Sequence, residues 1–491
     1  MAMIGSLCLC WQATQGAKPK DEMLELYGLF VDAVEKVEAN YVRPVSRREL
    51  LENALEGMLQ SLDQHSSYIN TNEWKQFRKQ IEGKFGGIGI QVGIDPDTGR
   101  LRVIAPMVGT PAYEAGVLAG DQIVEIDGHP TEGMSPDKAV DFLTGRPGTE
   151  VSLSVLHEGG EQPETLKINR AIIEVPSVSG DHRGPNDQWD YMIDKDKIGY
   201  IRISTFIQNT ADELRKALVQ LKDEGVRGLI LDLRDDPGGL LSSAVEIADL
   251  FLERGKIVST EGRNTIPKEY LAQRDSPYED LPLVVLINQN SASASEIVAA
   301  ALQDNKRATI IGQRSYGKGS VQNILELEDG NSVLKLTVAS YHRPNGDNIH
   351  RFRDAKTTDK WGVSPNPGME VKLTPSEYRN WFLARRDRDR DSARGHRKTT
   401  EPKHEGDKVH EPKREGDKTQ GKDKDKEKPQ AKEAEKPASP PSADEKNKEK
   451  DKPQLKLHSH EEPHPFVDKV LDKALEVLRA KLAEEPKAKA A

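Results

Sequence analysis

The chain of 491 residues is poor in cysteine, in aromatic residues and in long apolar runs. Its only cysteines are Cys8 and Cys10, so neither a disulfide framework nor a cysteine-based zinc site can form. Hydrophobic residues make up 35% of the chain and aromatic residues 5%. Even when the 39 glycines are added, the apolar share stays below the roughly 45–50% that is usual for a globular protein. No apolar run of about 18 residues occurs, which excludes a polytopic membrane protein.

The low apolar share comes largely from one segment. Residues 385–463 carry 23 Lys and Arg and 20 Asp and Glu in 79 positions, and EPKHEGDK at 401–408 returns as EPKREGDK at 411–418. Such a tract has too little apolar surface to bury a core, so we predict a disordered, charged, low-complexity linker over 385–463. The rest of the chain has an acidic balance, which argues against nucleic acid as the main partner.

The two ends of the chain differ in character. Residues 1–21 begin with the apolar stretch MAMIGSLCLCWQA, which has no basic residue before it and is short for a complete secretory signal. A truncated signal, the end of an anchor helix and a disordered terminus all remain open. Near the other end, apolar residues from Phe466 to Leu478 recur at helical spacing, which predicts an amphipathic helix over 464–485.

Three further segments follow from hydrophobic periodicity. Residues 22–83 show leucines at helical spacing and predict a helical N-terminal region. Residues 84–172 have short apolar runs separated by glycines, whereas over 173–384 strand-like runs alternate with helical patterns. Alternation of this kind predicts an α/β core with helices packed on a sheet.

The segment GQRSYGKG at 312–319 nearly matches the phosphate-binding loop GxxxxGK followed by Ser or Thr. Gly319 stands where the magnesium-binding hydroxyl must be, and Val321–Leu327 alternates like a strand. Because a phosphate-binding loop leads into a helix, we reject a nucleotide site and expect no cofactor.

A serine cluster offers a different chemistry. Ser291, Ser293 and Ser295 follow a predicted strand and open a predicted helix, where a hydroxyl meets the positive end of the helix and the next backbone N–H can stabilise an oxyanion. Lys318 can take a serine proton only when it is neutral, and burial lowers a lysine pKa by disfavouring the charged form. Alone, each motif fits equally a helix cap or a glycine-rich turn.

Other hydrolytic chemistries lack their motifs. The histidines outside the charged tract, among them His65 and His350, form no HExxH pair, and no GxSxG elbow occurs. These absences argue against a zinc hydrolase and against a histidine-based triad. We therefore expect no metal site.

Taken together, several motifs resemble those of the C-terminal processing peptidases, also called tail-specific proteases. They are NQNSASASEIVAAALQDNKRATIIGQRSYGKGSVQ at 288–322, DLRDDPGGLL at 232–241, KIGYIRISTF at 197–206, GGIGIQV at 86–92 and AGVLAGDQIVEIDG at 115–128. The resemblance covers most of residues 22–375. It implies a serine endopeptidase with a Ser–Lys dyad and a Clp/crotonase-like α/β core, into which a PDZ domain is inserted over 84–172.

Carried over to this chain, the family's roles fall on the nucleophile Ser293, the general base Lys318, the lysine-placing Gln322, the oxyanion-hole residues Gly238, Gly239 and Ala294, and Asp304 in a supporting role. Two departures are mild. Asp235-Asp236 replaces a pair that usually contains asparagine, and Gln64 stands where proline is common.

The PDZ-like segment predicts a peptide-binding site. A glycine-rich loop presents backbone N–H groups to a terminal carboxylate, while the peptide adds as a strand to the sheet edge. We expect Gly86, Gly87, Ile88 and Gly89 to form the loop and the strand from Ile90 to receive the peptide. A plain turn between two strands would show the same glycines.

We therefore predict a serine endopeptidase that cleaves near the C-terminal tails of protein substrates, with the PDZ domain selecting or gating them. The alternative is a catalytically latent PDZ scaffold that binds protein C-termini. The resemblance further implies an extracytoplasmic location, periplasmic or membrane-associated through the N-terminus, and a homodimer or higher oligomer formed through the helical ends.

Overall fold

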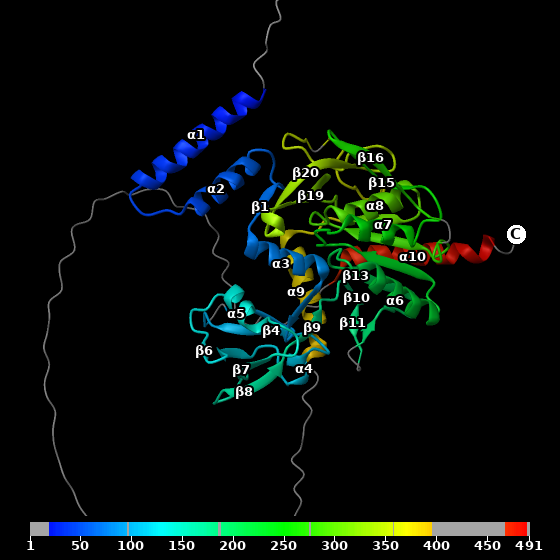
Figure 1. Cartoon of the computed structure of the whole chain (residues 1–491). Coiled ribbons are helices and arrows are strands. Elements are labelled where there is room, and N and C mark those ends of the chain that lie inside the picture. Colours follow the sequence, from blue (N-terminus) through cyan, green and yellow to red (C-terminus); the bar gives the residue numbers. More distant parts are fainter. Residues whose placement is uncertain are drawn as a thin grey trace, which may run out of the picture. The chain divides into compact units, whose positions relative to one another are not determined.

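The structure, a computed structural model, describes residues 19–95, 98–184, 188–273, 276–356, 358–394 and 467–488. Figure 1 traces this part of the chain from blue to red. The apolar Met1–Ala13 and residues 395–466 of the charged tract lie outside the described residues, so the predictions made for them stay predictions. None of the helices in the described ranges combines the length and apolar character needed to cross a bilayer.

The N-terminal region is helical as predicted, but it also contains a strand. The helices are α1 (Pro19–Asn40), α2 (Arg47–Gln60) and α3 (Thr71–Glu82). Between α2 and α3, β1 (Ser67–Ile69) pairs antiparallel with β20 (Ser332–His342), and so ties this region to the core. The predicted helical region is confirmed, and β1 is an addition that the sequence did not show, because a strand of three residues is too short to show its own periodicity.

Residues 84–174 form a β-rich module around its own apolar core. Its elements are β2 (Lys84–Gly87), β3 (Ile90–Ile94), β4 (Leu101–Pro106), α4 (Pro111–Glu114), β5 (Gln122–Ile126), β6 (His129–Pro130), α5 (Pro136–Leu143), β7 (Glu150–Leu156), β8 (Glu164–Asn169) and β9 (Ala171–Glu174). The main sheet has the order β3-β4-β5-β7-β8, with β6 paired to β5, while β2 pairs with β9. Thus β3 is an edge strand, and α5 packs beside it.

The glycine-rich segment of this module is a shorter loop than we expected. Gly86 and Gly87 belong to β2 and pair with β9, so that only Ile88 and Gly89 connect β2 to β3. Glycine is required at position 86 because a Cβ there would lie 2.1 Å from the carbonyl oxygen of Gly145. The backbone of β2 thus runs against the segment that follows α5, a tertiary contact that the glycine pattern does not distinguish from a loop.

The core is built on a five-stranded sheet of order β10-β13-β14-β17-β18. Its strands are β10 (Val178–Ser179), β13 (Ile198–Ile203), β14 (Gly228–Asp232), β17 (Leu283–Ile287) and β18 (Thr309–Gly312), and its helices are α6 (Thr210–Asp223), α7 (Leu241–Asp249), α8 (Ala294–Asp304) and α10 (Lys469–Ala488). The last four strands run parallel to their neighbours, and β10 runs antiparallel to β13.

Helices cover both faces of this sheet. Side chains alternate along a strand, so Leu229 and Leu231 of β14 pack with α6, α7 and α8, whereas Ile230 packs on the other face with α10. Burial on both faces explains why these strands read as continuous apolar runs in the sequence. The α/β core predicted from that pattern is confirmed.

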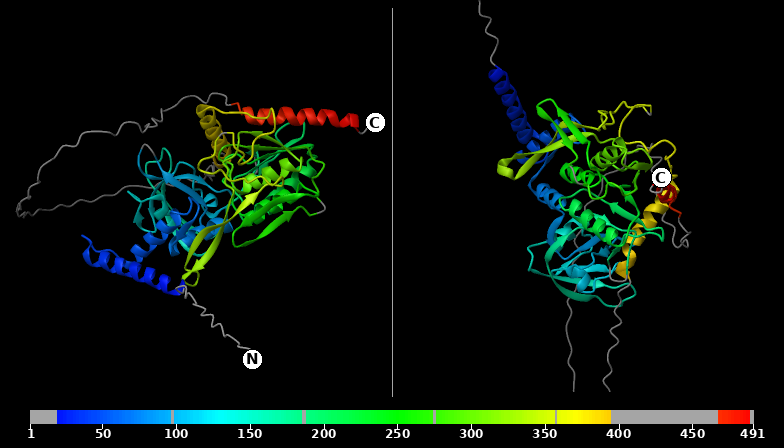
Figure 2. Two further views of the ribbon diagram at one scale, coloured as in Figure 1. Left: turned by 90° about the horizontal axis from the view of Figure 1, so that it is seen from above. Right: turned by 90° about the vertical axis from the view of Figure 1, so that its right-hand side faces the viewer.

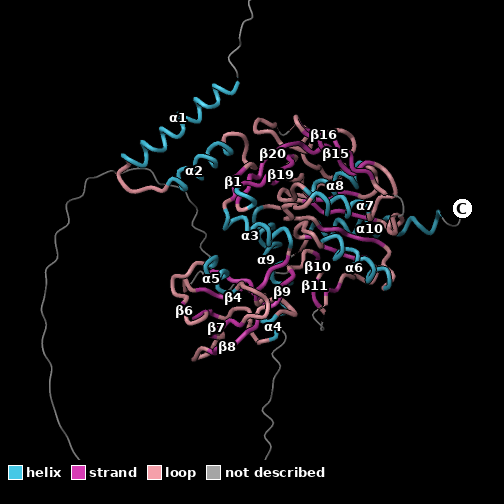
Figure 3. The backbone as a smooth tube through the Cα atoms, viewed as in Figure 1, coloured by secondary structure: helices cyan, strands magenta, loops and turns pink. Residues whose placement is uncertain are grey.

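A second sheet lies beside the first and joins segments from distant parts of the chain. It has the order β1-β20-β15-β16, with β19 (Ser320–Leu327) paired to β20, and includes β15 (Lys256–Gly262) and β16 (Thr265–Leu271). Figure 3 shows these strands in magenta. A small hairpin pairs β11 (His182–Arg183) with β12 (Trp189–Asp190), and a 3-10 turn, η1, spans Glu328–Gly330. Since β19 follows Gly319 directly, the strand that argued against a phosphate-binding loop is confirmed.

Residues 385–394, the first part of the predicted disordered linker, are helical, so the prediction is wrong there. A helix, α9 (Pro375–Arg394), continues past the expected boundary at residue 385. Arg385 is buried, donates to the carbonyl oxygen of Gly180 (3.0 Å) and pairs with Asp389 one helical turn on. Composition alone cannot show that such an arginine has buried partners.

The closing amphipathic helix is confirmed over the residues described. Val470, Ala474, Leu478 and Leu482 of α10 are buried against the central sheet, and Figure 2 shows α10 in red from two further directions. The helix begins at Lys469, and the expected start at 464–466 lies outside the described residues.

Candidate active site

Ser293 occupies the turn between β17 and α8, directly before the first helical residue. Its backbone has φ 56° and ψ −112°, in a region that a residue other than glycine adopts only when its surroundings enforce it, at a cost on the order of 1–3 kcal/mol. A strained strand-to-helix turn of this kind is one known way of presenting a nucleophilic serine.

The neighbouring serines have a different task. Ser291 Oγ donates to the carbonyl oxygen of Leu233 (2.7 Å), and Ser295 Oγ donates to that of Asp236 (2.9 Å). Both side chains are fully buried. These two hydrogen bonds join the serine turn to the loop that follows β14. Of the three serines, Ser293 is the one with the strained backbone.

The loop after β14 lies directly against the serine turn. A Cβ on Gly238 would lie 2.7 Å from the amide nitrogen of Ala294, and one on Gly239 would lie 2.0 Å from the carbonyl oxygen of Phe206. The φ angles of the two glycines are 93° and 151°, so both positions require glycine. The structure therefore brings Gly238 against Ser293 and Ala294, while Gly239, the next residue of the loop, lies against the backbone of Phe206.

The amide groups of this loop are not equivalent. Gly238 N–H donates to Asp236 Oδ1 (2.8 Å), so it is engaged within the loop. Ala294 is the first residue of α8, and the first N–H groups of a helix have no acceptor inside it. Burial raises the pKa of Asp236 well above its usual range. Asp236, the second residue of the Asp235-Asp236 pair that departs from the family pattern, is therefore a buried acceptor for the backbone of this loop.

Glu296 was missed by the sequence analysis, although it joins the serine turn to the lysine turn. Its Oε2 accepts from the amides of Ser293 and Lys318, each at 2.8 Å, and its Oε1 accepts from the amide of Gly317 (2.7 Å) and from Ser315 Oγ (2.5 Å). The side chain is 0% exposed, and burial raises its pKa. A glutamate three residues after a helix-capping serine is a capping-box signal that would have identified it.

Lys318 lies half-buried in the turn before β19. Burial lowers its pKa, and the positive charge of Lys335 lowers it further, while Glu296 opposes both. A lowered pKa favours the neutral amine, which is the form that a general base requires. Within the described ranges no hydrogen bond joins Lys318 Nζ to Ser293 Oγ, a contact that in unliganded enzymes often closes only when substrate binds.

Gln322 and Asp304 lie in different surroundings. Gln322 is on β19, and its Nε2 donates to Thr337 Oγ1 on the adjacent strand (3.2 Å) rather than to Lys318. Asp304 is the last residue of α8 and pairs with Arg343 (2.6 Å). It is about 16 Å along the helix from Ser293, at 1.5 Å per residue. Asp304 therefore holds the segment after β20 and does not reach the serine.

Two histidines come close to Lys318 through the fold. The rings of His65 and His350 are 6.4 Å apart. Burial lowers the pKa of both, and the charge of Lys318 lowers that of His65 further. They belong to distant loops, so no spacing in the sequence could pair them. Over the residues described, no group of three or more His, Cys, Asp or Glu could hold a metal ion.

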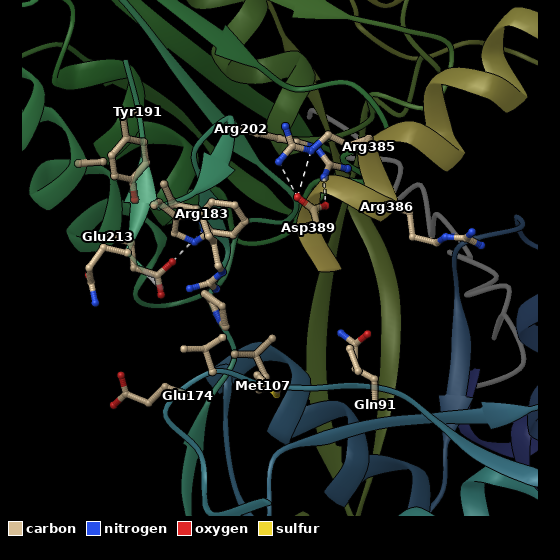
Figure 4. A pocket seen from close by; sticks show the side chains of 18 of the residues that line it. Gln91, Met107, Glu174, Arg183, Tyr191, Arg202, Glu213, Arg385, Arg386 and Asp389 are labelled. Carbon is tan, nitrogen blue, oxygen red and sulfur yellow. Dashed lines mark hydrogen bonds and ion pairs between the residues drawn. The ribbon is translucent and has the colours of Figure 1, made fainter. Parts of the chain in front are cut away.

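A cavity of about 820 Å³ lies elsewhere, between the β-rich module and α9. It is lined by Gln91 and Met107 on the module side and by Arg202, Arg385 and Asp389 on the core side. Figure 4 shows both arginines directed toward Asp389, at 3.3 Å and 3.0 Å. Neither the serine nor the lysine lines this cavity, so it is not where the serine chemistry occurs.

A strained serine on a strand-to-helix turn, together with a separate module that leaves an edge strand open, defines a serine hydrolase equipped to bind peptides. Comparison with known proteins makes this specific. The model of peptidase family S41 matches residues 197–365, and that of a PDZ domain matches residues 102–156. The chain belongs to peptidase family S41, among its carboxy-terminal-processing members.

The relatives include the carboxy-terminal-processing protease of Bartonella bacilliformis, 40% identical over 74% of this chain and 82% of that one. The carboxyl-terminal-processing protease of Synechocystis sp. is 39% identical over 67% of this chain and 74% of its own. Among solved structures, a photosystem II D1 C-terminal processing protease is 31% identical, covers 70% of this chain and 92% of that one, and has a TM-score of 0.40. The predicted family, fold class and serine-type peptidase activity are confirmed.

Proposed function

We propose that Ser293 is the nucleophile and Lys318 the general base of this peptidase, and that the amides of Ala294 and Gly239 bind the oxyanion. One observation carries the proposal. The backbone amides of Ser293 and Lys318 both donate to Glu296 Oε2, at 2.8 Å each. A single buried carboxylate oxygen therefore holds the two turns in register. The lowered pKa of Lys318, due first to burial, supports its role as a base.

The chemistry follows from these positions. Neutral Lys318 takes the hydroxyl proton of Ser293 as Oγ bonds to the scissile carbonyl carbon, and the two amides bind the negative oxygen that forms. Collapse breaks the C–N bond, and Lys318 passes its proton to the leaving amine. Water then attacks the ester carbonyl while Lys318 takes one of its protons. As the bond between this carbon and Ser293 Oγ breaks, Lys318 returns the proton to Oγ, which restores both the hydroxyl and the neutral lysine.

The PDZ domain binds the C-terminal tail of the substrate. Since β3 is an edge strand with α5 beside it, a peptide can add there as a further strand. Its terminal carboxylate is received at the Ile88–Gly89 connection, between Gly86-Gly87 and Ile90. Gln322 serves as a positioning residue on β19. Asp304, which pairs with Arg343, contributes to the fold rather than to the reaction.

The test uses the full chain, a fluorogenic peptide with a free C-terminus and an acylating serine probe. Ser293→Ala and Lys318→Ala should each lower kcat roughly 10³-fold or more, and Ser293→Ala should also abolish labelling. Ser61→Ala, an exposed serine that ends α2, is the matched control and should keep full activity. Full activity in both dyad variants would refute the assignment.

A latent scaffold is the competing function, and one observation favours it. No hydrogen bond links Ser293 Oγ to Lys318 Nζ in the part of the chain that the structure describes, which a resting, inactive arrangement would also produce. The probe separates the two. A scaffold binds a peptide with a free C-terminal carboxylate more tightly than its amide, but Ser293 stays unlabelled even when that peptide saturates the PDZ domain.

The location and assembly of the protein follow from the resemblance alone. We infer an extracytoplasmic enzyme, associated with the membrane through its N-terminus or free, and dimeric or larger through α1, α2 and α10. The apolar Met1–Ala13 supports export. Fractionation of cells that produce the full chain with a C-terminal tag tests the location, because recovery in the cytoplasm alone contradicts it. Light scattering of the purified chain tests the oligomer, which a monomer at all concentrations contradicts.

A further inference from the structure

Arg234 is a buried cation at the start of the loop after β14, and its partners are one carboxylate of the adjoining strand and two side chains from distant segments. Its guanidinium is 2% exposed and binds Asp232 of β14 through Nη2 (2.6 Å). It also stacks on Trp381 of α9, 4.5 Å from the ring centroid. The third partner is Asp468, which receives Nη1 and Nη2 on its two oxygens, both at 2.9 Å.

Asp468 combines two roles at the start of the chain's last helix. Its Oδ1 accepts from the amides of Val470 (3.2 Å) and Leu471 (3.1 Å), which caps α10. The same carboxylate is the second anionic partner of Arg234 beside Asp232, and only 14% of its side chain is exposed. Without Asp468, Asp232 would still balance the charge of Arg234, but the guanidinium Nη1–H group would lose its acceptor, and a buried donor without an acceptor is destabilising. The N-terminus of α10 is therefore fastened to the end of β14 by two hydrogen bonds between charged groups.

The loop fastened in this way is the one that meets the serine turn. Asp235 has φ 58°, its amide donates to Asn288 Oδ1 (3.0 Å), and its Oδ1 accepts from Tyr378 Oη of α9 (3.0 Å). Four residues after Arg234 in the same loop, Gly238 touches the turn that carries Ser293. The outer side of the loop is thus held by α9 and α10, while its inner side faces the nucleophile.

We propose that Asp468 is a positioning residue for the peptidase reaction. By accepting two hydrogen bonds from the Arg234 guanidinium it fixes the loop that presents Gly239, so full catalytic rate requires α10 to be docked from beyond the charged tract. This proposal rests on the oxyanion role given above to that loop. It makes the last helix part of the active-site support, although the sequence places the charged tract between this helix and the rest of the enzyme.

The test is Asp468→Asn in the full chain, because asparagine also caps helices well. Its oxygen can keep the cap of α10, while the charge and the acceptor for Arg234 Nη2 are lost. The kcat for the fluorogenic peptide should fall between about ten- and hundred-fold, as when an active-site group is slightly misplaced. KM should stay at the wild-type value, since the PDZ groove is untouched. The rising limb of the pH profile should also stay in place, since Lys318 is not perturbed. Asp468→Glu keeps the charge but moves it by one methylene and should give an intermediate kcat.

Two control variants on α10 separate positioning from docking. Arg479→Gln removes exposed ion pairs with Asp194 (2.8 Å) and Asp196 (2.9 Å) and should keep the wild-type kcat. Val470→Ala loosens the packing of α10 without touching the carboxylate. All rates are measured well below each variant's melting midpoint.

A wild-type kcat in Asp468→Asn overturns the proposal, and so does an equal loss of kcat in Val470→Ala, which would show that docking alone matters. If only Asp468→Glu folds, a wild-type kcat in that variant overturns it. Activity retained by Ser293→Ala would instead refute the dyad assignment on which the proposal rests, so the two failures are distinguishable.

Discussion

Replacing Glu296 with glutamine tests how the two reactive turns are held together. The carboxylate accepts four hydrogen bonds, from the amides of Ser293, Gly317 and Lys318 and from Ser315 Oγ. A glutamine side chain accepts through one atom only, and its NH₂ group would face donors. Whichever way the amide is turned, two of these donors lose their acceptor.

The size of the effect follows from the burial of the site. A buried donor left without an acceptor costs about 1–3 kcal/mol, so two of them cost about 2–6 kcal/mol. That is a large part of the 5–15 kcal/mol that typically stabilises a folded domain. Because the lost bonds fix either the serine turn or the lysine turn, kcat should fall along with stability, and KM should change little.

The assay is urea unfolding combined with hydrolysis of the fluorogenic peptide. Glu246→Gln on the neighbouring helix α7 is the matched control. The Glu246 side chain is 53% exposed, and the change removes an ion pair with Arg215 at 3.4 Å. This control should stay within about 0.5 kcal/mol of wild type. If Glu296→Gln matched the control in both stability and kcat, the carboxylate would not be what holds the turns together.

Three further predictions concern other parts of the enzyme. Burial and then the charge of Lys335 lower the pKa of Lys318, so Lys335→Met should raise that pKa and move the rising limb of the kcat/KM profile to higher pH. Gly239→Ala should abolish activity and lower the melting temperature, because its Cβ would lie 2.0 Å from a backbone oxygen. Leu478→Ala, fully buried in α10, should cost about 2–5 kcal/mol in urea unfolding.

Each of these has a matched control in the chain. Lys167→Met, on an exposed lysine of the PDZ domain, should leave the pH profile in place. A shift of the profile as large as that in Lys335→Met would contradict a specific effect of Lys335 on the pKa of Lys318. Gly346 also has a positive φ, 90° against 151° for Gly239, but has open space around it. A loss of activity in Gly346→Ala as large as that in Gly239→Ala would mean that backbone strain, not the clash, disables Gly239→Ala. Glu476→Ala is exposed on α10 and should be nearly neutral, and a neutral Leu478→Ala would contradict the packing of this helix.

The sequence by itself determined the elements whose signal is local. The runs that became β13, β14 and β17 read as buried strands because both of their faces are covered, and the helical spacing near the end of the chain marked α10. The serine at the start of a helix and the glycine-flanked lysine were likewise visible, because the chemistry of a nucleophile and a base restricts residue types at short range. The family and its serine-type activity were predicted from the resemblance of these and further motifs to the C-terminal processing peptidases.

Only the tertiary structure decided what holds these pieces in place. β1 is a strand because its residues pair with β20, and Gly86 and Gly87 are in a strand because they pair with β9. α9 continues past residue 385 because Arg385 donates a hydrogen bond to the carbonyl oxygen of Gly180. Glu296 and Asp468 act on turns far from them in the chain. The physical reason is the same throughout. A periodic pattern reports which face of a segment is apolar, whereas a buried charge is stable only beside partners that the fold brings from elsewhere.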